Sequence, residues 1–256
     1  METIKEALTF DDVTLAPNYS SYLPSEVKTS IKLSKNLNLK IPILSSAMDT
    51  VTESNMAVAI GKSGGLGVVH RNLTIEDQIF EIKKIKKNKC LVGAAVGASE
   101  NEYERVKKIL KENIDLIVVD TAHGHTKKVG EIIKKIILIK PKKTSVCAGN
   151  IATSEAAKFL VRLGVDIIKV GIGPGSICTT RLVTGIGVPQ LSAIMNVKKG
   201  IGKSKTTIIA DGGIKFSGDI AKALAAGADA VMIGSLFAGT DEAPGKLIKK
   251  NGILYK

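Results

Sequence analysis

Eight short apolar segments recur along the chain, each separated from the next by a stretch long enough for a helix. They are apolar throughout rather than alternating, so we expect strands buried on both faces, as in a parallel sheet covered by helices. Strands alternating with helices favour a (β/α)8 barrel, with an open doubly wound sheet as the alternative. The length of 256 residues matches the roughly 250 residues typical of such a barrel. The expected strands are residues 41–46, 67–70, 91–97, 115–120, 145–150, 166–171, 207–211 and 230–234.

Local signals mark where helices begin and where the pattern fails. Thr74 with Asp77, and Ser99 with Glu102, have the spacing of capping boxes, which predicts helix starts at both places. The glycine- and proline-containing segment after residue 234 leaves little room for an eighth helix. We therefore expect that helix to be missing or incomplete. We also expect the apolar outer face of the first and last strands to be partly exposed.

Composition restricts the class of protein. Three cysteines are too few for a disulfide framework, which indicates a reducing compartment. No signal-peptide pattern and no stretch of about 18 apolar residues is present, so we expect a cytoplasmic protein without a membrane span. The 37 basic and 24 acidic residues give a net charge of +13. Because the lysines lie mainly in helical stretches with few aromatics, we expect solvated helix faces that attract small anions rather than a nucleic-acid surface.

A glycine-rich segment follows the sixth expected strand and carries Cys178. In a barrel, catalytic groups gather where strands end and the following loops begin. Glycine amides can approach an anion closely, and a serine hydroxyl adds a donor. The sequence therefore predicts a phosphate cradle on the last strands, although each glycine taken alone is equally compatible with a tight turn. The predicted cradle consists of Ser176, Gly212, Gly213, Gly234 and Ser235.

Two aspartates at strand ends are each compatible with two roles. Asp211 is suited to a ribose diol or to capping the next turn, and Asp120 has the same alternatives. Asp120 with His123 and His125 also imitates a metal site, but no further ligand is spaced nearby.

The three cysteines have different expected environments. Cys90 and Cys147 lie at or within strands and are expected to be small core residues. Cys178 lies in a polar loop near Arg181, which would favour the thiolate, and it is the candidate nucleophile.

Seven segments together resemble the inosine monophosphate dehydrogenase family over nearly the whole chain. The pair formed by Gly-Pro-Gly-Ser-Ile-Cys-Thr-Thr and the Asp-Gly-Gly segment is highly specific. The matching segments are residues 8–15, 45–53, 64–70, 149–153, 173–180, 210–219 and 239–245.

The resemblance implies a mechanism. Cys178 would attack C2 of inosine monophosphate, hydride would pass to NAD, and water would hydrolyse the covalent intermediate to xanthosine monophosphate. Thr180 would assist the activation of water. The predicted cradle would hold the phosphate and Asp211 the ribose. Carbonyls of Gly173, Gly175 and Cys178 would bind potassium. The residues implied to lie against NAD are Asp120, Thr121, Ala122, Gly171, Ile172 and Gly173.

Two departures from the family pattern qualify this reading. The pair of CBS modules usual in the family is absent near residues 89–91, so we expect one catalytic barrel over residues 1–256. The family's flap segment, which supplies water-activating residues, would follow Lys256. We therefore expect at most a burst of NADH, because formation of the covalent intermediate needs less of the flap than turnover does.

Two alternatives stay open. GMP reductase shares the barrel and the cysteine loop and lacks CBS modules, although Val188-Pro-Gln190 and residues 211–245 look like the dehydrogenase. The other alternative is a truncated barrel that binds a purine nucleotide without turnover. The family also implies a homotetramer.

Overall fold

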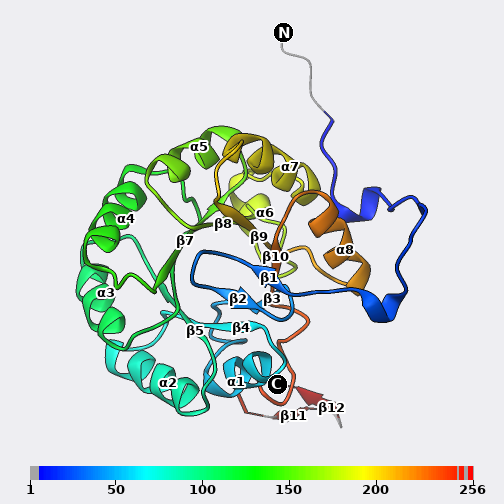
Figure 1. The fold of residues 1–256 in the computed structure, drawn as a ribbon. Helices are drawn as coiled ribbons and strands as arrows, with labels where there is room; N and C mark the ends of the chain where they lie inside the picture. The colour runs from blue at the N-terminus through cyan, green and yellow to red at the C-terminus, as the bar shows by residue number, and fades with distance from the viewer. Residues whose placement is uncertain (1–5, 247, 251–252, 256) are drawn as a thin grey trace.

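A computed structural model describes residues 6–246, 248–250 and 253–255. Eight parallel strands form a closed barrel ringed by helices (Figure 1). The barrel closes where β10 pairs with β3, with Met232 opposite Leu44. The predicted (β/α)8 barrel is thus confirmed and the open sheet is excluded. The barrel strands are β3 (Ile43–Ser45), β4 (Leu66–Val69), β5 (Val92–Val96), β6 (Leu116–Asp120), β7 (Ser145–Ile151), β8 (Ile167–Val170), β9 (Thr207–Asp211) and β10 (Ala230–Ile233).

The helices lie outside the strands. Most of the apolar residues between these two layers are fully buried, which explains why the strands are apolar on both faces. The helices are α1 (Ser54–Lys62), α2 (Ile75–Lys87), α3 (Glu102–Lys111), α4 (Lys127–Ile139), α5 (Ser154–Arg162), the short α6 (Thr180–Thr184), α7 (Gln190–Ile201) and α8 (Ser217–Ala225).

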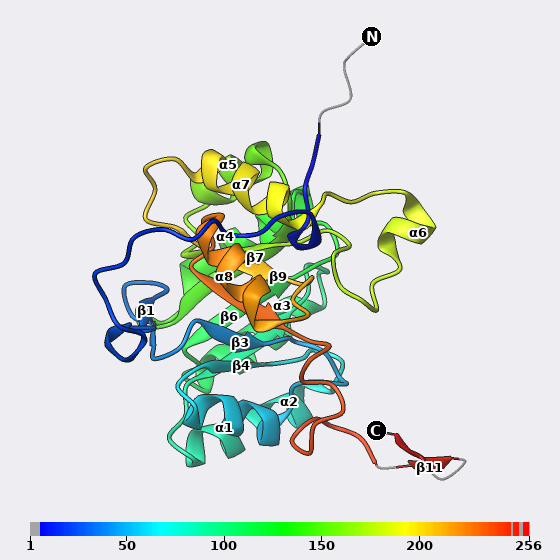
Figure 2. The same cartoon turned by 90° about the vertical axis from the view of Figure 1, so that its right-hand side faces the viewer.

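A small hairpin that the sequence reading did not anticipate closes the amino-terminal end of the barrel. It consists of β1 (Ile31–Lys32) and β2 (Asn38–Leu39). Leu33, Leu37 and Leu39 are at most 3% exposed and belong to the same cluster as the side chains inside the barrel. The hairpin and α6 lie at opposite ends of the molecule (Figure 2). Because the hairpin seals one end, access to the barrel interior is limited to the other.

The two predicted helix starts have different outcomes. Thr74 caps α2 as expected, its hydroxyl accepting a hydrogen bond from the Asp77 amide at 3.1 Å. Ser99 does not cap α3, which begins at Glu102. The Glu102 carboxylate instead accepts a hydrogen bond from the Gly97 amide at 2.6 Å, so it anchors the loop after β5.

Three aspartates tie the amino-terminal ends of neighbouring strands together. Each directly precedes a strand, and its carboxylate accepts a hydrogen bond from a backbone amide at or near the start of the adjacent strand. The pairs are Asp115 with Val92 at 2.9 Å, Asp166 with Val146 at 2.8 Å, and Asp229 with Ile208 at 2.7 Å.

The described residues after β10 contain no helix, so the helix expected to be missing after the eighth barrel strand is not present there. Turns lead to a hairpin of β11 (Ile248–Lys250) and β12 (Ile253–Tyr255). The expected partial exposure of the outer strand face is confirmed for β3, where Ile43 is half-buried, and is wrong for β10, where Val231 and Ile233 are at most 4% exposed. These two residues belong to the core cluster that also contains Phe10 and α8 residue Ala223. Among the described residues, no helix has the length and apolar character needed to cross a membrane.

Candidate active site at the mouth of the barrel

The cysteine loop runs from the end of β8 to the start of α7 and includes α6, which projects from the barrel (Figure 2). The Cys178 thiol donates a hydrogen bond to the Thr180 hydroxyl, with 3.2 Å between Sγ and Oγ1. The Cys178 amide donates to the Gly175 carbonyl at 3.1 Å. This turn presents a half-buried thiol to the mouth of the barrel.

Arg181 has a different part in the loop from the one expected. Its guanidinium donates hydrogen bonds to the carbonyl oxygens of Ile172, at 3.4 Å, and Val188, at 2.5 Å. Its aliphatic stem occupies the space beside Gly173, where a Cβ atom would lie 2.5 Å from Cγ of Arg181. Arg181 therefore braces the two ends of the loop against each other through these carbonyl groups.

A pocket of about 290 Å³ opens beside Cys178. It brings together the residues expected to be catalytic and those expected to lie against NAD, from the ends of β6 and β8, with Asp211 at the end of β9. The predicted residues that line it are Cys178, Thr180, Asp120, Thr121, Ala122, Gly171, Ile172, Gly173 and Asp211.

A smaller hollow of about 80 Å³ continues this pocket, because Asp211 and Met232 line both. All five residues of the predicted cradle line it, namely Ser176, Gly212, Gly213, Gly234 and Ser235. No hydrogen bond within the described part of the chain engages the exposed hydroxyls of Ser176 and Ser235, so both are free to donate to a ligand.

Close packing of two loops explains the glycine at position 212. Its φ of +92° lies in the left-handed region, and an added Cβ would approach Cγ of Pro174 to 3.0 Å. Glycine at this position lets the loop after β9 pack directly against the cysteine loop. The thiol and the small hollow therefore share one wall.

Beneath the pocket, a buried lysine joins the two candidate aspartates. Lys169 of β8 is 4% exposed, and its Nζ lies 2.8 Å from Oδ1 of Asp120 and 2.6 Å from Oδ2 of Asp211. Asn150 bonds to Lys169 through Oδ1 and donates to Asp211 through Nδ2 at 2.9 Å. Asn150 also donates to the Gly171 carbonyl at 2.8 Å. These bonds hold both carboxylates at the floor of the pocket.

The two carboxylates determine the charge of this lysine. Burial alone would lower the pKa of Lys169, but Asp120 and Asp211 outweigh it and hold that pKa above the usual range. Lys169 is therefore an ammonium ion, and the cluster carries one more negative charge than positive. Cys147, which is fully buried within β7, has its pKa raised to about 12 by that burial and is a core thiol as expected.

Among the pocket residues that were not predicted from the sequence, the charged and amide side chains are those of Lys169, Asn150 and Arg71. One signal was present for Lys169, since a single lysine interrupts the apolar run of β8. Arg71 follows β4 and lies in an exposed position that no local pattern distinguishes.

The metal alternative gains no support from the geometry. Asp120 is paired with Lys169, and the His125 ring packs against Phe159 with 5.0 Å between ring centroids. Among the described residues, no group of three or more histidine, cysteine, aspartate or glutamate side chains is arranged to hold a metal ion.

Comparison with known proteins identifies the family of the chain. Residues 7–256 match the family model of the IMP dehydrogenase / GMP reductase domain. The chain is 47% identical to an inosine-5'-monophosphate dehydrogenase of Borreliella burgdorferi, over 98% of this chain and 74% of the relative. It is 44% identical to that of Cryptosporidium parvum, over 100% and 74%, and 35% identical to that of Bacillus subtilis, over 98% and 78%. On these matches and the barrel fold, the chain belongs to the IMP dehydrogenase / GMP reductase family.

Proposed function

We propose that this chain oxidises inosine monophosphate to xanthosine monophosphate with NAD, a step of guanine nucleotide biosynthesis. The observation that carries the proposal is the position of the Cys178 thiol. It lines the same pocket as Asp211, which in turn borders the glycine- and serine-lined hollow. A nucleotide whose phosphate occupies the hollow would extend its base toward the thiol.

The residues around the hollow supply what a nucleotide monophosphate needs. Backbone amides at glycines and the hydroxyls of Ser176 and Ser235 suit phosphate oxygens. The Asp211 carboxylate, 18% exposed, has Oδ2 bonded to Lys169 and Asn150. Its remaining oxygen is available to accept hydrogen bonds from a ribose diol. The substrate is thereby fixed at two points before the base reaches Cys178.

The proposed reaction has two steps. The Cys178 thiolate adds to C2 of the purine, and the hydrogen at C2 departs with its electron pair, leaving a thioimidate on the enzyme. NAD, when bound, supplies the acceptor for that hydride. Water then adds at C2 and the sulfur leaves, which gives xanthosine monophosphate and the free thiol. The Thr180 hydroxyl, 3.2 Å from Sγ, is placed to exchange a proton near C2.

The nicotinamide ring would lie beside the Cys178 thiol. Gly171, Ile172 and Gly173 line this part of the pocket together with Asp120, whose carboxylate is 29% exposed and contacts Lys169 through Oδ1. The two glycines allow the wall itself to pack closely, because the Asp211 carbonyl and the Arg181 stem fill the space where their Cβ atoms would lie. We assign Asp120, Thr121, Ala122 and this wall to NAD binding.

The cysteine loop also suits a monovalent cation. Gly173, Gly175 and Cys178 belong to one short segment of this loop, and the Gly175 carbonyl accepts a hydrogen bond from the Cys178 amide. Such a carbonyl keeps a second lone pair, and backbone oxygens are the ligands that potassium prefers. Potassium at this place would stiffen the loop that carries the nucleophile.

We further propose a cytoplasmic homotetramer. Large hydrophobic side chains are exposed along the extended segment after η1 (Phe10–Asp12), including Tyr19, which is 91% exposed, and Tyr22, which is 72% exposed. This segment stands away from the barrel (Figure 1). A contact with neighbouring copies would remove those surfaces from water.

Assays of two reactions, the oxidation of inosine monophosphate and the reduction of guanosine monophosphate, test the function. We expect NADH to form when the chain is given inosine monophosphate, NAD and potassium, and no NADH to form with Cys178→Ala. Consumption of NADPH with guanosine monophosphate, without NADH formation from inosine monophosphate, would show a reductase instead. Nucleotide binding with neither reaction would show a barrel that binds without turnover.

A further inference from the structure

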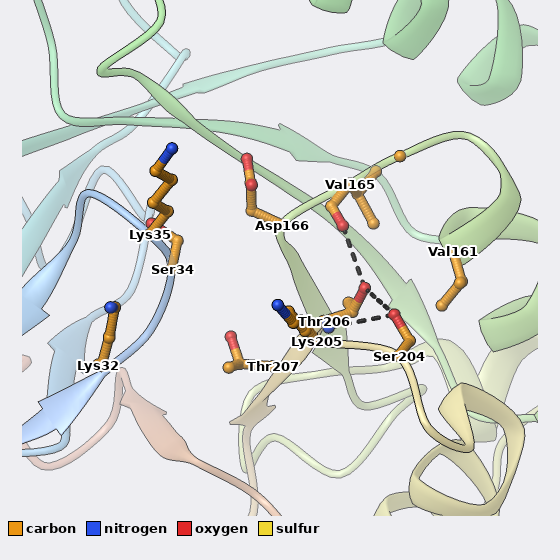
Figure 3. A pocket seen from close by; sticks show the side chains of 11 residues that line it. Lys32, Ser34, Lys35, Val161, Val165, Asp166, Ser204, Lys205, Thr206 and Thr207 are labelled. Carbon is orange, nitrogen blue, oxygen red and sulfur yellow. Dashed lines mark hydrogen bonds between the residues drawn. The ribbon is translucent and has the colours of Figure 1, made fainter.

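A second cavity, of about 760 Å³, lies at the amino-terminal end of the barrel (Figure 3). Its walls are the turn of the β1–β2 hairpin and the segments that lead into β8 and β9. Asp166, which lines it, directly precedes β8, whereas Gly171 of the candidate active site follows the other end of the same strand. The two cavities are thus separated by the length of the barrel.

Three lysines surround this cavity. Lys32 and Lys35 come from the hairpin on one side and Lys205 from the segment before β9 on the other (Figure 3). All three are exposed, and within the described part of the chain none of them forms an ion pair or a side-chain hydrogen bond. The acidic side chain among the lining residues is Asp166. The cavity therefore carries an excess of positive charge that the fold does not neutralise.

The hydroxyl groups of the wall are already engaged, and they fix its shape. Ser204 and Thr206 share a hydrogen bond at 2.9 Å, and Thr206 also donates to the Val165 carbonyl at 3.2 Å. Thr207 donates to the Leu33 carbonyl at 2.6 Å, which ties β9 to the hairpin. The wall is consequently preformed, and the lysine ammonium groups are its free donors.

Like charges held around one cavity repel each other, and a multivalent anion would relieve that repulsion. The volume lies within the roughly 300–1,000 Å³ of small-molecule sites. From these observations we propose that this cavity binds an oligophosphate, either free or carried by a nucleotide. Three ammonium groups match a chain of phosphates better than a single one. Val161 and Val165 give an apolar wall against which a base can lie.

Calorimetric titration of the full chain at low salt with tripolyphosphate and with ATP tests the proposal. The test variant carries Lys32→Gln, Lys35→Gln and Lys205→Gln. A matched control carries Lys87→Gln, Lys128→Gln and Lys134→Gln. It removes the same charge from exposed helix positions whose side chains form no ion pair or hydrogen bond within the described part of the chain.

We expect wild-type chain and control to bind tripolyphosphate alike, and the test variant to bind it at least ten-fold more weakly. Tighter binding of ATP than of tripolyphosphate, lost in the test variant, would identify a nucleotide as the source of the phosphates. Equal affinity for ATP and tripolyphosphate would show that only the phosphates are recognised and would identify a free oligophosphate as the ligand. No binding of either ligand to the wild type, or equal affinity in both variants, would overturn the proposal. Nucleotide binding at the barrel mouth does not involve these lysines and should persist in the test variant. If the oligophosphate proposal fails, the proposed function is therefore unaffected.

Discussion

Replacing Lys169 with methionine tests how much the fold depends on the charge cluster beneath the pocket. Methionine keeps most of the length of the side chain and removes its charge, so Asp120 and Asp211 lose the ammonium that both contact, at 2.8 and 2.6 Å. Two like charges about 5 Å apart at an effective dielectric constant of about 20 repel by roughly 3 kcal/mol. Breaking a buried charge pair typically costs about 3–5 kcal/mol.

The partial exposure of the carboxylates, 29% for Asp120 and 18% for Asp211, places the expected loss at the lower end of that range. We therefore expect Lys169→Met to lose about 3 kcal/mol of unfolding free energy at pH 7. At roughly 2–4 °C per kcal/mol for a chain of this size, that is a fall in Tm of about 6–12 °C. Lys169→Arg keeps the charge and serves as the control.

The pH dependence of this loss supplies a second readout. In the wild type the pKa of Lys169 is raised above its usual 10.5, so its contribution is fully present below that pH and is lost as pH rises through the folded-state pKa. In Lys169→Met that contribution is absent at every pH. Urea unfolding should therefore show a deficit that is constant from pH 7 to about pH 10 and shrinks as pH rises above 10.5, where the wild type loses the contribution. A deficit below about 1 kcal/mol at pH 7, or one that grows as pH rises above 10.5, would refute this reasoning.

Three further substitutions test other parts of the account. Gly171→Ala would place a Cβ atom 2.1 Å from the Asp211 carbonyl oxygen. The free energy of unfolding measured in urea should therefore fall by about 1–3 kcal/mol. Gly218→Ala has open space around the added Cβ atom, so it serves as the control and should leave the unfolding free energy unchanged. Burial opposes ionisation of Asp219, but backbone amide bonds lower its pKa below 3.8, so the stability it contributes should be present above that pH and lost as pH falls. The deficit of Asp219→Ala should accordingly be visible at pH 7 and vanish in strong acid, and a constant deficit would contradict it. Because burial raises the Cys147 pKa from 9.0 to about 12, unfolding free energy should fall between those values, and less steeply in Cys147→Ala.

The strands and the residues of the mouth were predictable because their signals are local. Fully apolar runs identify buried strands, and the carboxyl ends of parallel strands meet at one rim. Positions as distant as Asp120 and Gly213 could therefore be placed together from strand order alone. The left-handed turn at Gly212 follows from the same local chemistry.

Features that depend on contacts between distant segments were not predictable. The hairpin at residues 31–39 is too short to show a strand pattern, and its leucines are explained only by the barrel end that they close. Val231 is buried in one cluster with Phe10, which is far away in sequence. Glu102 has the spacing of a capping residue, yet it bonds to Gly97 because the loop after β5 brings that amide closer.

The central claim is a covalent bond between Cys178 and the purine ring, and intact-mass spectrometry with peptide mapping tests it most directly. After the chain is incubated with inosine monophosphate and NAD and quenched in acid, we expect one nucleotide adduct, confined to the peptide that contains Cys178 and absent from Cys178→Ser. An adduct on Cys90 instead, or no adduct while the nucleotide binds and NADH forms, would contradict the account.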